Sequence, residues 1–383
     1  MAPTKSRLTF IDSLRGFAAL WVVCYHLWNR FYPALSSQGH VLSAGPPSNL
    51  GSALTFFTFG FGYSGVTLFF VLSGLCIHLP QARRGNLWVP LSEFTSRRFW
   101  RLYPAYIASI VFSVIALAIP KILLLAIGKN IGTFNWWAEV RGTDAIISAV
   151  FLQQFWPKSL GLNGVYWTLV FEVQFYIVYP MLLWCLRKAS LVLVGIVLFL
   201  CEIYFALFPT PVQCFFPARY FEWFLGVIAA EALIKNPKWA SSTVLNLCAM
   251  IGGVGGVFSV FEPHLYPFRD LLFAVGYFGL LLLVAKSSGL LMRVFNWPVM
   301  AGLGVFSYSL YLIHVPIIDL VWVANDRLLA TRGSNQQLVH LLSFVSIPIS
   351  ILVAYAFYWL FERPFLRTKQ TNHDRVSDLK IGS

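Results

Sequence analysis

The fold class that this sequence predicts is an all-α polytopic membrane protein, with about ten transmembrane helices and one candidate re-entrant segment. Of the 383 residues, 58% are hydrophobic and only 11% are charged, whereas soluble domains average about 25% charged residues. Long apolar stretches recur along the whole chain, a pattern typical of helices and not of membrane barrels. A soluble fold cannot bury so much apolar surface, so we expect a lipid bilayer around the chain.

Each predicted span has close to the 20 or so apolar residues that a membrane helix needs. In chain order, the predicted spans are 14–33, 55–79, 102–127, 166–186, 189–208, 219–234, 242–260, 270–285, 301–324 and 338–361. An even number of crossings places both termini on the same side. The apolar stretch Ala145–Trp156 is too short to span, so we expect it to be re-entrant or to lie on the interface.

The distribution of charge orients these spans. With a cytoplasmic N-terminus, most of the 28 Lys and Arg residues fall on the cytoplasmic side, as the positive-inside rule requires. The net charge of +13 therefore does not imply a nucleic-acid partner. We predict a cell inner (plasma) membrane location with both termini cytoplasmic, a membrane domain over residues 1–363 and a disordered cytoplasmic tail over residues 364–383.

Two ionisable residues share one face of the first span. Arg15 and His26 are eleven positions apart, which is close to three full turns and about 16 Å along a helix. Charged or titratable groups inside a membrane are costly and mark functional sites by default. The cysteines form neither a CxxC motif nor a Cys/His cluster with zinc spacing, so we expect no metal site.

Three titratable residues fall at a similar predicted depth in three different spans. These residues are His26, Glu172 and His314. One interpretation is a shared polar cavity within the membrane. The other is that each side chain is satisfied separately by a neighbour on its own helix, and depth alone does not decide between them.

A basic cluster and a small-residue pair have alternative interpretations too. Arg98 and Arg101 share a helix face, and near a helix N-terminus they could bind phosphate, with Arg15 at the same level. The alternative is a positive-inside membrane anchor. Ser73 could act as a nucleophile, but Ser73 and Gly74 together favour close helix packing.

These features fit a group transfer from an anionic cytoplasmic donor. A neutral imidazole can take the proton of a hydroxyl as that hydroxyl attacks an acyl carbon. A carboxylate such as Glu172 could hold the correct tautomer and stabilise the imidazolium.

Four motifs carry a resemblance to a known family. They are FIDSLRGFAALWVVCYH (10–26), FFVLSG (69–74), RRFWRLYP (97–104) and YWTLVFEVQFYIVYP (166–180), supported by SYSLYLIH (307–314) and FERP (361–364). In this order they cover almost the whole chain. The sequence thus resembles the acyltransferase-3 family of membrane O-acyltransferases, the type that O-acetylates O-antigen and other surface polysaccharides.

The resemblance implies transfer of an acyl group, usually acetyl, from acyl-CoA to a hydroxyl of a cell-surface carbohydrate or a lipid-linked sugar. Acetyl-CoA would be the donor substrate, and lipopolysaccharide or exopolysaccharide would be typical acceptors. His26 would be the catalytic base, assisted by Glu172. The coenzyme A phosphates would face the arginines Arg15, Arg98 and Arg101. Three further residues would support the site: Ser73, Trp167 and His314.

Two other functions remain open from the sequence. A proton-coupled transporter or flippase of envelope precursors would also place His and Glu inside the membrane, although we see no internal repeat of the kind that such proteins show. A membrane acyltransferase acting on lipids or proteins would share the chemistry and differ in substrate. For acceptor contacts we look to the outer loops around Phe134–Trp137 and Phe155–Trp167.

Overall fold

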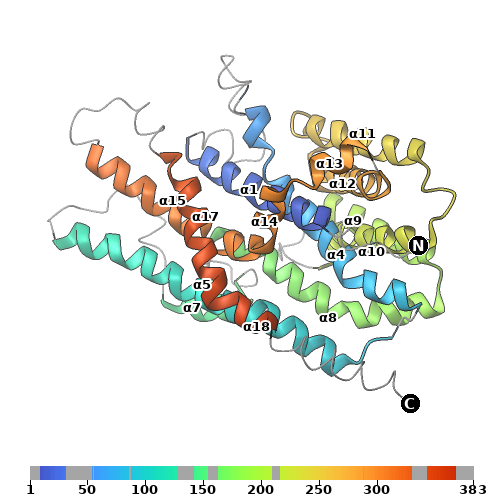
Figure 1. Ribbon diagram of the computed structural model, residues 1–383, viewed down its shortest axis with the longest axis horizontal. Coiled ribbons are helices and arrows are strands. Elements are labelled where there is room, and N and C mark those ends of the chain that lie inside the picture. Colours follow the sequence, from blue (N-terminus) through green and yellow to red (C-terminus); the bar gives the residue numbers. More distant parts are fainter. Residues whose placement is uncertain are drawn as a thin grey trace. The chain divides into compact units, whose positions relative to one another are not determined.

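The structure is a computed structural model, in which regular structure is entirely helical over the described residues. These are residues 9–31, 54, 56–85, 88–126, 142–153, 163–208, 216–287, 289–329 and 343–367. No strand occurs in these ranges, so the predicted all-α class is confirmed. The chain divides into two compact units, one of 1–89 with 167–307 and one of 90–166 with 308–383, and Figure 1 shows their helices in chain colours.

Six helical segments in the described part of the chain are long and apolar enough to cross a membrane. They are Phe56–Arg84, Leu91–Pro120, Gly164–Lys188, Tyr266–Lys286, Ser307–Asn325 and Ser346–Leu366. Two shorter apolar helices, Leu191–Leu207 and Ser242–Phe258, coincide with two further predicted spans. The polytopic architecture is therefore confirmed, while the number of ten crossings stays a prediction.

The first unit contains most of the helices. They are α1 (Thr9–Phe31), α4 (Ser64–Arg84), α8 (Trp167–Lys188), α9 (Leu191–Leu207), α10 (Tyr220–Lys235), α11 (Ser242–Phe258), α12 (Arg269–Lys286), α13 (Leu290–Phe295) and α14 (Pro298–Val305), with short helical turns at Phe56–Gly60, Phe216–Ala218 and Tyr266–Phe268. Local sequence sets several of the ends. Ser190 and Ser241 cap α9 and α11 by accepting backbone N–H groups. Gly85 and Asn236 end α4 and α10 in the left-handed conformation.

Glycines bring α4 and α10 into backbone contact. A Cβ atom on Gly74 would overlap the carbonyl oxygen of Trp223, and one on Gly226 would overlap that of Val71. Small residues allow this approach in membrane helices, so the packing interpretation of Gly74 is confirmed. Ser73 next to it accepts a hydrogen bond from Trp223 Nε1 at 3.3 Å.

The predicted single span 301–324 is wrong, because the chain breaks at Phe306. There α14 ends and α15 (Ser307–Leu329) begins. The reason lies in packing against α1: a Cβ on Gly304 would overlap the carbonyl of Asp12, and one on Gly16 would overlap that of Met300. Close packing on α1 thus fixes α14 within the first unit, which ends at Ser307, next to the break.

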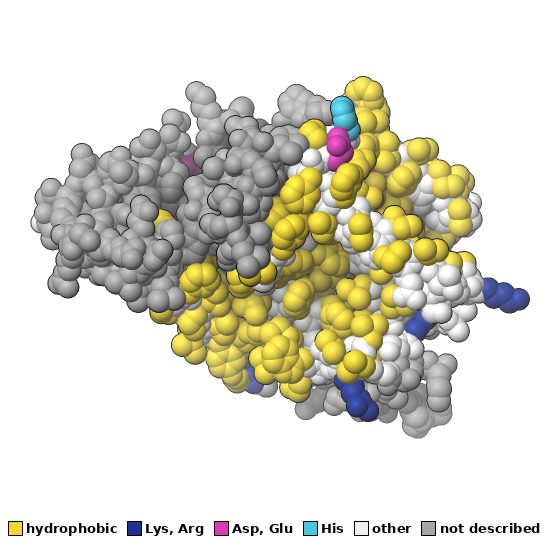
Figure 2. Space-filling model, turned by 90° about the horizontal axis from the view of Figure 1, so that it is seen from above, with side chains coloured by type: hydrophobic (Ala, Val, Ile, Leu, Met, Phe, Trp, Pro, Cys, Tyr) yellow, Lys and Arg dark blue, Asp and Glu magenta, His cyan; other side chains and the backbone are white. Residues whose placement is uncertain are grey.

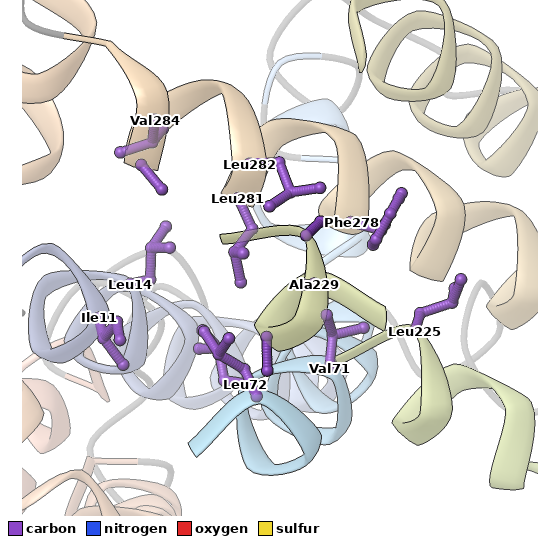
Figure 3. Close-up of a cluster of buried hydrophobic side chains, with 14 of the residues drawn as sticks. Ile11, Leu14, Val71, Leu72, Leu225, Ala229, Phe278, Leu281, Leu282 and Val284 are labelled. Atoms are coloured by element: carbon purple, nitrogen blue, oxygen red, sulfur yellow. The ribbon is translucent and has the colours of Figure 1, made fainter. Parts of the chain in front are cut away.

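An apolar core lies where α1, α4, α10 and α12 meet (Figure 3). Its centre includes Leu14, Val71, Ala229 and Leu281, all 1% exposed or less. The outward faces of the helices are apolar as well, with Ile177 71% and Val254 65% exposed. Figure 2 shows this apolar surface on one side of the molecule, broken by few charged side chains. Exposed apolar patches of this extent are expected where lipid surrounds the protein.

The second unit holds α5 (Leu91–Ala126), α7 (Gly142–Ala149), α15, α17 (Ser346–Phe357), a π-helical turn (Tyr358–Glu362) and α18 (Arg363–Arg367). The helix α7 has eight residues, so the stretch 145–153 is too short to span, as predicted; residues 154–156 lie outside the described part. The predicted tail is helical as far as Arg367, because Phe365 stacks on Trp100 of α5 with ring centroids 5.8 Å apart. Residues 368–383 lie outside the described part.

Candidate active site

The first unit places His26 on the predicted face of α1. This helix is continuous from Thr9 to Phe31, so Arg15 and His26 do share one helix. The His26 Nδ1 atom lies 2.9 Å from the carbonyl oxygen of Val22. A carbonyl can only accept, so Nδ1 carries the hydrogen, and in the neutral imidazole Nε2 is the acceptor nitrogen. Nε2 is then the basic atom of this half-buried ring.

Glu172 and His314 also have partners on their own helices. The Tyr176 hydroxyl donates to Glu172 from four residues further along α8, and His314 Nδ1 lies 3.1 Å from the Leu310 carbonyl on α15. With His26, each of the three residues thus has a hydrogen-bond partner on its own helix, and the shared polar cavity stays a prediction. The place on His26 Nδ1 that the sequence suggested for Glu172 belongs to the Val22 carbonyl.

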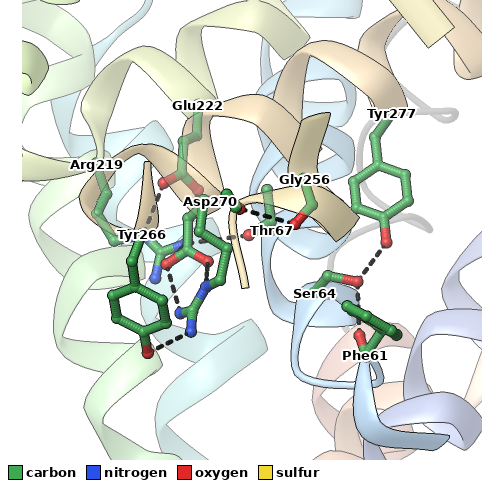
Figure 4. A network of polar contacts seen from close by, with 11 residues as sticks. Phe61, Ser64, Thr67, Arg219, Glu222, Gly256, Tyr266, Asp270 and Tyr277 are labelled. Carbon is green, nitrogen blue, oxygen red and sulfur yellow. Dashed lines mark hydrogen bonds and ion pairs between the residues drawn. The ribbon is translucent and has the colours of Figure 1, made fainter. Parts of the chain in front are cut away.

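A partly buried ion network joins the first turns of α4, α10 and α12 (Figure 4). Arg219 bonds both carboxylate oxygens of Glu222 at 2.9 Å, the Thr67 hydroxyl at 3.0 Å and Asp270 at 3.1 Å. Asp270 also pairs with Arg269 at 2.9 Å. Because the charges of the network are compensated within hydrogen-bond distance, removal of one partner would leave an uncompensated charge.

Aromatic rings cover the two arginines of the network. The Arg219 guanidinium lies 5.1 Å from the ring centre of Phe70 and 5.5 Å from that of Trp167. This contact places Trp167, which the sequence singled out, against the network. Arg269 lies 4.2 Å from the ring centre of Tyr63, an arrangement that favours a desolvated cation.

Sequence reasoning missed this network, although a signal for it existed. Arg219 and Glu222 are three residues apart, and Arg269 and Asp270 are adjacent. Each pair falls at the predicted beginning of an apolar span, where charges are ordinarily taken as the end of a loop. Four charged residues at the starts of two spans are worth treating as a candidate network.

A second buried polar cluster links α4, α8 and α10. His78 is fully buried, and its Nε2 lies 2.8 Å from Glu231 while its Nδ1 lies 3.0 Å from the Tyr179 hydroxyl. Lys235 approaches the other oxygen of Glu231 at 2.7 Å. The sequence around His78 gave no sign of these partners, which come from helices about one hundred residues or more away.

The second unit holds Arg98 and Arg101, and here one prediction needs correction. The helix α5 begins at Leu91 and not near residue 102, so the two arginines lie in its second and third turns. Only the first four N–H groups of a helix are free, so the backbone at these positions offers no N–H to phosphate. The Arg98 guanidinium lies 5.5 Å from the ring centre of Phe94, and both arginine side chains are half-buried.

The two supporting C-terminal motifs meet in the same unit. The Ser309 hydroxyl donates to the buried carboxylate of Glu362 at 2.6 Å, and Tyr308 donates to the Leu102 carbonyl on α5 at 3.0 Å. These bonds tie the start of α15 and the π-helical turn to the helix that carries Arg98 and Arg101. The FERP motif therefore has a structural partner in SYSLYLIH.

The sequence matches a family model over almost its full length. The model describes an acyltransferase domain and aligns with residues 8–359. The chain belongs to the acyltransferase-3 family. The alignment includes the first-unit helix with Arg15 and His26 and the second-unit helix with Arg98 and Arg101, so both sets of candidate residues lie in the family domain.

The chain is similar in sequence to several named proteins. The chain is 28% identical to the peptidoglycan O-acetyltransferase OatA of Listeria monocytogenes, over 81% of this chain and 49% of the relative. It is 28% identical to the putative peptidoglycan O-acetyltransferase YrhL of Bacillus subtilis, over 81% of this chain and 48% of the relative. It is 24% identical to the acyltransferase MdmB of Streptomyces mycarofaciens, over 83% of this chain and 81% of the relative. The chain thus spans about half the length of the first two. No solved structure matches it.

Proposed function

We propose that this family member is a membrane O-acetyltransferase that moves an acetyl group from acetyl-CoA to a hydroxyl of a cell-envelope carbohydrate. The observation that carries the proposal is the family match together with the orientation of His26, whose Nδ1 is held by Val22. The names of OatA and YrhL support peptidoglycan as the first acceptor to test. Glycolipids and other envelope polysaccharides come next.

The proposed reaction uses His26 twice. As the acceptor hydroxyl attacks the thioester carbonyl, Nε2 takes its proton, and the new C–O bond forms. The C–S bond then breaks, and the coenzyme A thiolate takes the proton back from the imidazolium. The Val22 carbonyl keeps the ring in the required tautomer throughout, a role that the triad logic ordinarily gives to a carboxylate. Glu172 is proposed to stabilise the imidazolium that forms.

The cytoplasmic side is proposed for the donor because of where the basic residues lie. In the first unit, α4, α8, α10 and α12 all end with basic residues, at Arg84, Lys188, Lys235 and Lys286. The positive-inside rule assigns these ends to the cytoplasm. The opposite ends, where the ion network lies, would then face the outside, toward the acceptor. Arg15, Arg98 and Arg101 are proposed to bind the phosphates of coenzyme A.

The test uses the full chain in nanodiscs with acetyl-labelled acetyl-CoA and a peptidoglycan fraction, beside other envelope polysaccharides. Alkali-labile label in the carbohydrate is the readout. His26→Ala is expected to abolish the label, while His264→Ala, a change at an exposed histidine, keeps it. Binding of coenzyme A, weakened at least several-fold by Arg98→Ala, tests the donor site separately. Full transfer by His26→Ala would refute the proposed base, and solute movement without use of acetyl-CoA would favour the transporter.

A further inference from the structure

Beyond the identity of the base, the structure connects the base to the partly buried ion network. We propose that Arg269 and Asp270 act as positioning residues for His26, holding it through the rings of Tyr63 and Tyr25 and balancing the charge around it. This inference rests on the proposed function, because it concerns the proposed base. Its test is chosen so that the two can fail separately.

Asp270 is the centre of the network (Figure 4). One carboxylate oxygen accepts from Arg269 Nε at 2.9 Å, and the other accepts from Arg269 Nη2 at 3.2 Å. This second oxygen also lies 3.1 Å from Arg219 Nη2. The third nitrogen of the guanidinium, Nη1, donates a hydrogen bond to the Tyr266 hydroxyl at 2.7 Å. A guanidinium held at three nitrogens cannot rotate away, so its plane is fixed.

A series of ring contacts leads from Arg269 to His26. The fixed guanidinium lies 4.2 Å from the centre of the Tyr63 ring. Tyr63 meets Tyr25 edge to face, with centroids 5.6 Å apart and an interplanar angle of 70°. Tyr25 meets the His26 ring in the same way, at 5.3 Å and 74°. Edge-to-face pairs are the favourable arrangement for aromatic rings, so each contact restricts the next ring.

In this proposal, His26 is influenced by the charges of the network as well as by the ring contacts. Tyr25 on α1 contacts the His26 ring, and Tyr63 contacts Tyr25. Arg269 lies against Tyr63 and Tyr266, and it pairs with Asp270. Further along the network, Arg219 pairs with Asp270 and Glu222, and Glu202 accepts from the backbone of α10. Charges that are partly buried are screened less than charges in bulk solvent. Neutralising Asp270 therefore leaves extra positive charge near His26, and neutralising Arg269 leaves extra negative charge.

These two substitutions separate an electrostatic role from simple packing. Positive charge disfavours protonation of an imidazole and negative charge favours it. Asp270→Asn and Arg269→Gln should therefore perturb the titration of His26 in opposite directions. Loss of packing alone would perturb it in the same direction or not at all.

The measurement is carbethoxylation of His26 by diethyl pyrocarbonate, which reacts with the neutral ring and needs no acyl transfer. The full chain in nanodiscs is treated between pH 5 and 9, the His26 peptide is quantified by mass spectrometry, and an added histidine peptide corrects for the reagent. We expect the midpoint to move to lower pH in Asp270→Asn and to higher pH in Arg269→Gln. The acid limb of the pH profile of acetyl transfer should move in parallel.

Controls come from the same end of the helices. Tyr277→Phe removes a hydroxyl that bonds Ser64 at 2.6 Å without changing charge, and should leave the midpoint in place. Tyr63→Phe keeps the ring and should behave like the natural protein, whereas Tyr63→Leu should raise the modification rate of His26. Midpoints that move together, or not at all, overturn the inference. Opposite shifts of the His26 midpoint without acetyl transfer would support the positioning role of Arg269 and Asp270 and refute the proposed function. Acetyl transfer with unmoved midpoints would support the proposed function and refute the positioning role.

Discussion

Replacing Gly226 by alanine tests the backbone contact on which the first unit depends. The new Cβ would overlap the Val71 carbonyl oxygen and lie 2.5 Å from the Leu75 nitrogen and 2.9 Å from the Gly74 Cα. All of these neighbours are backbone atoms, so no side chain can rotate aside. To reach ordinary contact distances, α4 and α10 must separate by roughly 1 Å.

The expected cost follows from two opposing effects. Overpacking of this kind costs about 1–3 kcal/mol, while alanine gains about 0.5–1 kcal/mol over glycine within a helix. The net expectation is a loss of about 1–2 kcal/mol in the free energy of unfolding. Separation of the helices would also stretch the bonds of His78 to Glu231 and of Trp223 to Ser73, which are 2.8 and 3.3 Å long.

Gly253→Ala is the matched control. It makes the same substitution within α11, but its Cβ would meet nothing within 4 Å, so only the gain in helix propensity remains. The assay is the thermal midpoint of the detergent-solubilised chain, followed by fluorescence-detected gel filtration. We expect Gly226→Ala to fall below the natural protein and Gly253→Ala to equal or exceed it. Equal midpoints for the two variants would show that the α4–α10 contact yields without cost, against our reasoning.

Further predictions concern buried polar pairs. Glu362→Leu leaves the Ser309 hydroxyl without its acceptor, and we expect a loss of about 1–3 kcal/mol in the same thermal assay; an unchanged midpoint would argue against a structural role for FERP. Glu231→Leu removes the carboxylate from the fully buried His78 and should also cost about 1–3 kcal/mol. Lys235→Ala, at a side chain that is 72% exposed, should cost at most about 1 kcal/mol. If Lys235→Ala proved the more damaging of the two, our ranking of these contacts would be wrong.

Most helices could be predicted from the sequence because lipid imposes simple requirements on it. A span must be apolar and about 20 residues long, and most residues of each predicted segment are helical where the structure describes them. The prediction placed the start of α5 too late because residues 91–101 are polar and charged, and an apolar criterion does not recognise a helix that extends beyond the apolar region. It joined α14 to α15 because a break at one residue leaves apolar composition unchanged.

The candidate residues were accessible to sequence reasoning to different degrees. The face shared by Arg15 and His26 follows from helical periodicity alone, and α1 confirms it. The partner of His26 Nδ1 proved to be a carbonyl, which every residue carries and which no sequence pattern can single out. The contact of Trp167 with Arg219 joins residues that are far apart along the chain and could not be derived from their spacing.

The sequence by itself determined that the chain is helical, that it belongs in a membrane and that Arg15 and His26 share a helix, because composition and periodicity act locally. Only the tertiary structure decided which charges compensate one another. Arg219 and Asp270 lie fifty-one residues apart and meet at 3.1 Å because α10 and α12 both begin at the same end of the first unit. In an apolar interior, such charges persist only where folding brings their partners to them.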